Sequence, residues 1–308
     1  MSSVLFDVPG PRAIARNRII GVLTVLVVLA ALGWVTWRLY VTGQFSAEKW
    51  NIFTFSAVWV RFGQGLLSTL GAFAAAGVGS LVFGFILGIG RLSDHAWVRE
   101  PVRWIIEVLR AVPVLVLMML LYYGLPVIGV KMPPYFAVVI ALIVYNGSVL
   151  AEVLRTGVES LPRGQREAGY AIGLRKSGVM QLVLLPQAIR AMMPVIIAQL
   201  VVALKDTALG FIITYQELLY VINQIGNQAP YGSPLIQAAM VGGSMYVAVC
   251  LVLSYIAYRL QRRAKRSPKQ VAVAHNAAAD DESTMTEVIA LQSRAGKHDG
   301  SNSGAQGL

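Results

Sequence analysis

Residues 65–90 read GLLSTLGAFAAAGVGSLVFGFILGIG and contain no charged side chain. A helix of about 20 apolar residues crosses the ~30 Å hydrocarbon core of a bilayer, so this stretch predicts a transmembrane helix. The whole chain has the same character, because 56% of its 308 residues are apolar and only 13% are charged, with a mean hydropathy of +0.63. A water-soluble fold of this length could not bury so much apolar surface. The composition therefore excludes an ordinary soluble enzyme, a disordered regulator and a disulfide-rich secreted module.

Six apolar runs are long enough to span a membrane. The first follows Arg12, Arg16 and Arg18, so a cleaved signal peptide is an alternative. Its run exceeds the ~7–15 apolar residues of a signal core and has no clean small-residue cleavage site, which favours a retained anchor over residues 19–41. The sequence thus predicts an all-α, polytopic membrane protein of about six transmembrane helices, with spans at residues 19–41, 65–90, 104–125, 135–153, 180–204 and 237–258.

The basic side chains are distributed unevenly about these spans. Lys and Arg number 26 against 15 Asp and Glu, a formal charge of +11. With residues 1–18 in the cytoplasm, six crossings place 20 of the 26 cations on the cytoplasmic side, as the positive-inside rule requires. The charge therefore predicts orientation, with both termini cytoplasmic, and argues against a nucleic-acid partner. Residues 261–308 are Ala-, Ser- and Gly-rich with almost no aromatics and predict a disordered cytoplasmic tail.

Five small residues in the second run recur at intervals of four. They are Ala72, Ala76, Ser80, Gly84 and Gly88, which a helix places on one face. Such a face lets another backbone approach closely. The approaching helix belongs either to the same chain or to a partner subunit in a dimer, and the sequence leaves both open.

The chain offers little for chemistry at membrane depth. His95, His275 and His298 all lie outside the spans, and Cys250, the single cysteine, is expected to be a packed apolar side chain. There is no histidine pair or cysteine cluster at ligand spacing and no G-x-x-x-x-G-K-[ST] phosphate loop. We expect no metal site, no cofactor and no catalytic residue in this chain, which argues against a membrane-embedded enzyme.

Charges inside a span are costly, so the few present suggest function. Glu107 and Arg110 are three residues apart in the third run and share a helix face. One interpretation is a mutual ion pair, and the other places Arg110 on a solute path, where its guanidinium would bind a carboxylate. Pro113 is expected to perturb the helix and free backbone carbonyls. Further candidates for the same path are Asn146, Glu152, Lys205 and Asp206.

Between the fourth and fifth spans, on the predicted cytoplasmic side, stands LPRGQREAGYAIGLRKSGVMQLVLLPQAIRAMMP, residues 161–194. Pro162 suits a helix start, Glu167 suits the positive end of the helix dipole, and Gly173 permits a sharp exit. Pro186 is expected to break the backbone as the chain returns to the membrane. The pattern predicts a short, smooth helix that inserts into a groove on a partner, whereas a merely basic loop would leave the Gly and Pro positions unexplained.

This segment resembles the EAA signature, E-A-A-x(3)-G-x(9)-I-x-L-P, of the membrane subunits of ABC importers. Gly169 stands where that family usually has Ala, and Val183 where it has Ile. The resemblance implies contact with an ATPase through residues 161–178, and the matching positions are Glu167, Ala168, Gly169, Gly173, Leu185 and Pro186.

Neighbouring segments are similar to the polar amino-acid branch of the family, which takes up histidine, glutamine or glutamate. LRAVP maps the branch's F-R-G-T-P onto Arg110 and Pro113, and YNGSVLAEVLR matches its fourth span. Ala208 and Gln199 replace a usual Ser and Asn, which weakens a polar role there. The extra anchor and the Ala-rich tail look most like the second permease of a glutamate transport system.

The resemblance implies a five-span permease domain over residues 62–260, to which the anchor adds a sixth span and turns the N-terminus inward. It also implies several partners: a cytoplasmic ATPase dimer, a second permease subunit in a heterodimer, an extracytoplasmic binding protein and an amino-acid substrate, with glutamate first and glutamine, histidine or arginine as alternatives. ATP hydrolysis would lie on the ATPase. A secondary carrier is the rival, but it would show matching broken helices in two similar halves.

Overall fold

The computed structural model describes residues 10–265. Its contacts separate a unit that ends at Ile256 from a second that begins at Ala257, and the elements discussed below belong to the first unit unless stated. The last helix continues to Lys265, five residues beyond the predicted end of the permease domain. Of the predicted disordered tail, residues 261–265 therefore belong to this helix, and residues 266–308 lie outside the described part of the chain.

Helices make up all the regular structure of residues 10–265, as the composition predicts. Five apolar stretches are long enough to cross a membrane, and a bent helix pair raises the number to six. Four of the long helices contain one predicted span each and extend beyond it, whereas the predicted span 180–204 begins in the π turn that precedes α9. Their bounds are Pro11–Val41 (α1), Ser56–Arg91 (α3), Pro134–Glu159 (α6), Leu185–Asp206 (α9) and Leu235–Lys265 (α11).

Shorter helices make up the rest of the regular structure, and some of them are parts of candidate spans. Several are single turns of 3₁₀ or π helix, which mark places where the chain changes direction or hydrogen-bond register. They are α2 (Ala47–Asn51), η1 (Ile52–Thr54), α4 (Ala96–Ala111), α5 (Val114–Met119), η2 (Leu120–Gly124), η3 (Leu125–Ile128), α7 (Arg163–Ala171), α8 (Lys176–Gly178), η4 (Val179–Leu184), η5 (Thr207–Ile213), α10 (Leu218–Gly226) and η6 (Ala229–Tyr231).

The third predicted span is a pair of helical segments with a sharp bend between them rather than one straight helix. α4 ends at Ala111, and the chain from Val114 to Ile128 leaves at 95° to it. Val112 is extended, with φ −84° and ψ 122°, because the ring of the following Pro113 disfavours helical geometry in the residue before it. The perturbation expected at Pro113 is confirmed, and its size separates the two halves of the span.

The break expected at Pro186 is wrong. Pro186 lies in the first turn of α9, and residues Lys176–Ile213 form one candidate span. The preceding turn, η4, is a π helix, in which the hydrogen-bond ladder shifts by one residue. A proline has no N–H to donate, so it fits where that ladder is already interrupted and the helix continues past it.

The small-residue face of α3 packs within the chain. Ala72, Ala76 and Ser80 are fully buried, and the Ser80 hydroxyl donates to the Leu142 carbonyl of α6 at 3.2 Å. A Cβ on Gly84 would lie 2.7 Å from the Gly147 carbonyl oxygen of α6, closer than real Cβ atoms approach. The dimer interpretation of this face is therefore wrong, because α6 already occupies it.

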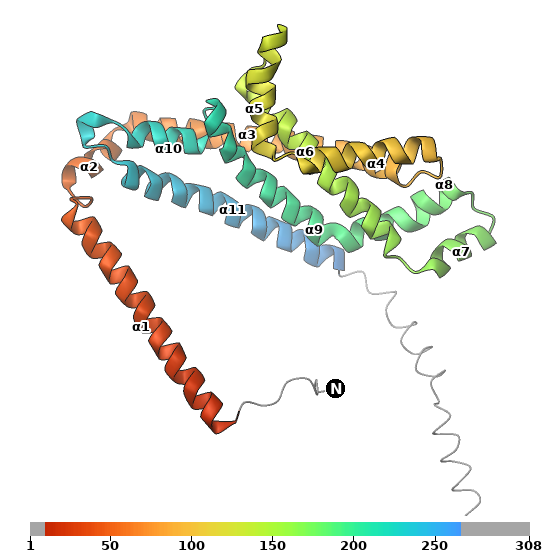
Figure 1. Ribbon diagram of the computed structural model, residues 1–308, viewed down its shortest axis with the longest axis horizontal. Coiled ribbons are helices and arrows are strands. Elements are labelled where there is room, and N and C mark those ends of the chain that lie inside the picture. Colours follow the sequence, from red (N-terminus) through yellow and green to blue (C-terminus); the bar gives the residue numbers. More distant parts are fainter. Residues whose placement is uncertain (1–9, 266–308) are drawn as a thin grey trace, which may run out of the picture. The chain divides into compact units, whose positions relative to one another are not determined.

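The two ends of the α3, α6 and α9 bundle carry different elements (Figure 1). α7 and α8 lie at one end, whereas α2 and α10 lie at the other. The end with α7 is the one predicted to be cytoplasmic. No residue of α1 is buried, so the packed core is built without the anchor.

Candidate functional site

A cavity of about 690 Å³ opens where the break at Pro113 separates α4 from α5. Arg110 from α4, Tyr145 from α6, and Asp206 from α9 line it. Arg110 and Asp206 are far apart in the sequence, and the packing of both α4 and α9 on α6 places them in the wall of one cavity. Glu107 also lines the cavity but is paired with Arg103, so Arg110 and Asp206 are the cation and the carboxylate left to match the α-carboxylate and α-ammonium of an amino acid.

Arg110 makes no ion pair within the described residues. The expected pair with Glu107 is wrong: the Glu107 carboxylate accepts instead from Arg103 Nε at 2.8 Å, one helical turn earlier. An (i, i+4) partner on the same helix face satisfies Glu107. Arg110 thus keeps its five N–H donors for a ligand in the cavity.

Asn146 does not line the cavity but orients a side chain that does. It is 1% exposed, and its Oδ1 accepts from Gln199 Nε2 at 2.8 Å, while its own Nδ2 donates to the Leu142 carbonyl at 3.0 Å. Gln199 lines the cavity. The sequence reasoning discounted Gln199 and missed Tyr145; a polar side chain in the apolar fifth span was the available signal for Gln199.

The remaining sequence candidates lie outside the cavity lining. Glu152 is held by Arg155 Nη2 at 2.6 Å, and Arg155 also pairs with Glu159. Lys205 is exposed beside the lining residue Asp206, and Pro113 acts through the bend. Among the sequence candidates, the structure therefore brings only Arg110 and Asp206 together in the cavity wall.

The predicted coupling segment, residues 161–178, contains α7, and a small hydrophobic cluster holds this helix in place. Glu167 and Ala168 are exposed, whereas Gly169 is buried against Val179, which is 1% exposed. A Cβ on Gly169 would lie 2.9 Å from Val179 Cγ2, which explains glycine where the signature has alanine. Leu185 lies in the same cluster as Val179, and Pro186 follows it in α9.

Gly173 ends this helix as the sequence predicts. Its φ is +84°, a left-handed conformation that glycine adopts without strain. Its N–H donates to the Tyr170 carbonyl at 2.9 Å, and the Leu174 N–H donates to the Gly169 carbonyl at 3.1 Å. This Schellman geometry satisfies the last carbonyls of α7 and fixes the angle at which the chain leaves it.

Glu217 is a buried carboxyl group that the sequence reasoning missed. It caps α10, with Oε1 accepting from the Tyr220 N–H at 2.6 Å and Oε2 from the Leu219 N–H at 2.8 Å. The side chain is fully buried, and this burial raises the pKa of Glu217 to about 7 against the opposing effect of the two N–H donors. Glu217 is therefore both the N-terminal cap of α10 and a carboxyl group that changes its protonation state near neutral pH.

Comparison with known proteins assigns the chain to a family. Residues 80–267 match the family of binding-protein-dependent transport system inner membrane components, so the chain belongs to this family. It is a multi-pass membrane protein and an amino-acid ABC importer permease.

Several relatives and solved structures share most of this chain. The glutamate transport system permease protein GluD of Corynebacterium glutamicum is 37% identical over 74% of this chain and 85% of its own. The glutamine transport system permease protein GlnP of Escherichia coli strain K12 is 33% identical over 69% of this chain and 98% of its own. A crystal structure of an amino-acid ABC transporter with histidines has a TM-score of 0.62 at 26% identity, covering 69% of this chain and 98% of that one.

Proposed function

We propose that this permease imports glutamate. The observation that carries the proposal is Arg110, a cation without an ion-pair partner in the described residues, in the wall of a 690 Å³ cavity beside Asp206. The 37% identity to a glutamate permease supports the same solute. Glutamate carries two carboxylates and one ammonium group, so a pathway with an available guanidinium favours it over a cationic amino acid such as arginine.

The charges suggest a role for each group. The planar guanidinium of Arg110 would bind a carboxylate through two parallel N–H donors. The Asp206 carboxylate would accept from the α-ammonium, and the Gln199 amide, oriented by Asn146 at 2.8 Å, would complete the polar wall. Glu107 also lines the cavity, but Arg103 neutralises it at 2.8 Å, which lowers its repulsion of an acidic solute.

The proposed complex contains three kinds of partner. Two ATPase subunits bind the exposed face of α7 and hydrolyse ATP, a second and different permease subunit completes the pathway, and an extracytoplasmic binding protein delivers the amino acid. The family description, which specifies dependence on a binding protein, supports the last of these. Both termini are proposed to be cytoplasmic, because that orientation places 20 of the 26 Lys and Arg residues on the cytoplasmic side.

The test is glutamate uptake by the whole complex in proteoliposomes, with glutamine, histidine and arginine as competitors. Arg110→Gln should lower uptake efficiency about 10- to 150-fold, because a hydrogen bond to a charged group contributes roughly 1.5–3 kcal/mol. The matched control is Lys205→Gln, which removes a cation beside the cavity but outside its lining and should leave uptake unchanged.

Three results would contradict the proposal. Normal uptake by the Arg110→Gln complex would remove Arg110 from the solute path. Stronger competition by glutamine or arginine than by unlabelled glutamate would assign another amino acid. Uptake by the purified chain alone, without ATP, would support the secondary carrier instead.

A further inference from the structure

An apolar groove runs along the outside of the bundle between α3 and α9. Its α3 wall is made by Leu81, Val82, Phe85 and Ile86, all of which are exposed. α6 and α9 supply the rest of a hollow of about 370 Å³, through Leu150, Leu154, Ile189 and Ile196. In the described structure this groove is filled by no side chain of the chain itself.

The groove continues toward the end of the bundle that carries α7. A second hollow of about 320 Å³ is lined by Ile89 on α3 and by Gln181 and Leu185 on η4 and α9. Phe85 and Ile89 are four residues apart, as are Gln181, Leu185 and Ile189, so each wall stays on one helix face. The two hollows therefore follow the same pair of helix faces along the bundle axis.

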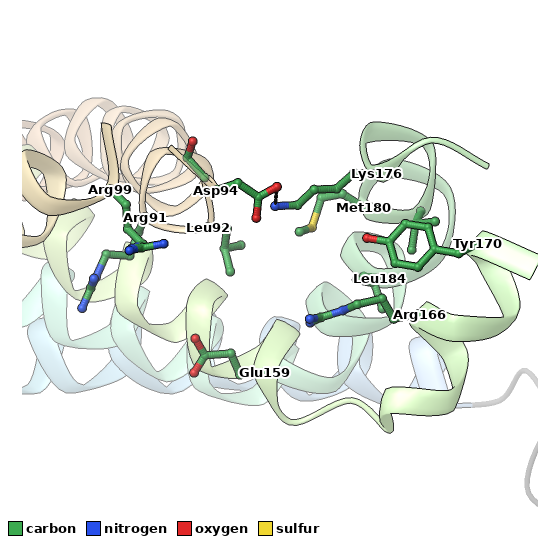
Figure 2. Close-up of a pocket in the computed structure, with 12 residues that line it drawn as sticks. Arg91, Leu92, Asp94, Arg99, Glu159, Arg166, Tyr170, Lys176, Met180 and Leu184 are labelled. Atoms are coloured by element: carbon green, nitrogen blue, oxygen red, sulfur yellow. Dashed lines mark ion pairs between the residues drawn. The ribbon is translucent and has the colours of Figure 1, made fainter. Parts of the chain in front are cut away.

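A third cavity, of about 380 Å³, adjoins the second, and the two share Leu92, Asp94, Lys176 and Met180 in their walls. Its character is cationic. Arg91 and Arg99 stand on one side, Arg166 points into the space from α7 on the other, and the Asp94 to Lys176 ion pair lies along one edge (Figure 2). The apolar groove thus ends in a basic pocket.

The pocket holds more cationic side chains than its acidic side chains can neutralise. The ion pair with Lys176 lowers the pKa of Asp94, so both groups stay charged. Glu159, the other acid in the wall, is taken by Arg155. Arg99 is paired with Glu100 at 3.2 Å, but Arg91 and Arg166 make no ion pair within the described residues. Two guanidinium groups from α3 and α7 therefore face one space without a counter-ion.

We propose that this continuous groove and pocket bind one glycerophospholipid with an anionic headgroup. The phosphate lies between Arg91 and Arg166, and an acyl chain lies along Ile89, Phe85 and Ile189. Arg91 directly follows the uncharged stretch 65–90, which places the pocket at the headgroup level of the bilayer. The bound lipid would connect α3 to α7, so it would stabilise the position of the coupling helix.

The test is native mass spectrometry of the full-length chain titrated with phosphatidylglycerol or phosphatidylcholine. The wild type should retain phosphatidylglycerol preferentially. The Arg91→Gln, Arg166→Gln double variant should bind it about 25-fold more weakly, about fivefold for each arginine near the membrane surface, and lose the preference. The matched control is Arg163→Gln, which removes a cation from the same helix α7 but outside the pocket. Unchanged binding in the double variant, or an equal loss in the control, would overturn the proposal.

Two further arms separate the lipid from other occupants. Ile189→Trp fills the groove and should weaken phosphatidylglycerol binding, whereas Val78→Trp, on an exposed position of α3 outside the groove, should not. Displacement of phosphatidylglycerol by millimolar inorganic phosphate with no effect of Ile189→Trp would show a soluble-anion site. In a Cys250→Ala background, a disulfide between two Phe85→Cys chains would show that a second copy covers the groove. Either result would overturn the lipid assignment.

Discussion

Gly169 offers a direct test of how α7 is held. The signature of the family favours alanine at this position, and an isolated helix would also gain from alanine, by about 1 kcal/mol. The fold opposes this preference. An alanine Cβ would lie 2.9 Å from Val179 Cγ2 and 3.4 Å from Val179 Cγ1, and the Val179 side chain is buried, with 1% of its surface exposed.

The magnitude follows from these two opposing effects. Overpacking a buried contact costs about 1–3 kcal/mol, and the higher helix propensity of alanine offsets about 1 kcal/mol of this cost. Gly169→Ala should therefore destabilise the folded chain by about 0–2 kcal/mol. Gly164→Ala, on the same helix α7, adds a Cβ with no atom within 4 Å and should stabilise by up to about 1 kcal/mol. The predicted difference between the two substitutions is therefore about 1–3 kcal/mol.

The assay is thermal unfolding of the purified chain followed by tryptophan fluorescence, with glutamate uptake by the complex as the second measurement. Val179→Ala removes the clashing methyl groups, so Gly169→Ala should cost less in that background, with a coupling of about 0.5–3 kcal/mol. If Gly169→Ala and Gly164→Ala had the same effect on the unfolding midpoint, or if the cycle showed no coupling, the proposed packing of α7 on Val179 would be refuted.

Two other predictions concern carboxylates at opposite ends of the bundle. Glu167→Lys reverses the charge on the exposed face of α7 and should abolish uptake while membrane insertion stays normal. The control Glu48→Lys, in α2, should leave uptake unchanged. Normal uptake by the Glu167→Lys complex would remove Glu167 from coupling. Burial raises the pKa of Glu217 from 4.5 to about 7, so the folded state holds a proton that the unfolded chain releases earlier. The free energy of unfolding should therefore fall by about 3 kcal/mol as pH rises from about 4.5 to 7. Glu217→Gln should remove this pH dependence from the unfolding midpoints measured between about pH 5 and 8. The same change of midpoint with pH in both proteins would contradict the prediction.

Much of the fold was accessible from local sequence because a bilayer imposes a length and a polarity on every span. Each predicted span lies in a helix or in the bent pair, and Pro113 and Gly173 act where backbone chemistry requires. Pro186 was misread because a proline signals a break only when its missing N–H interrupts a regular ladder. Here the π turn of residues 179–184 had already shifted that ladder, and no local pattern announces a π turn.

The candidate site was predictable only in part. Arg110 was recognised as a costly charge within an apolar span and Asp206 as a charge at the end of one, and both signals are properties of each residue alone. Whether Glu107 pairs with Arg110 or Arg103 depends on side-chain geometry, since three- and four-residue spacings both allow contact. Gln199 and Tyr145 reach the cavity through the packing of α6 on α9, which spacing along the chain does not encode.

The amino-acid sequence by itself determined that this chain is a helical membrane protein, where its spans lie, and that residues 161–178 contain a short helix between two of them. These properties follow from hydrocarbon thickness, backbone hydrogen bonding and the conformations of proline and glycine. Only the tertiary structure decided that the small-residue face of α3 meets α6, that the 95° bend opens a cavity beside Arg110, and that Arg91 and Arg166 face one pocket. These depend on contacts between residues distant in the sequence, and such contacts are set by packing rather than by any local pattern.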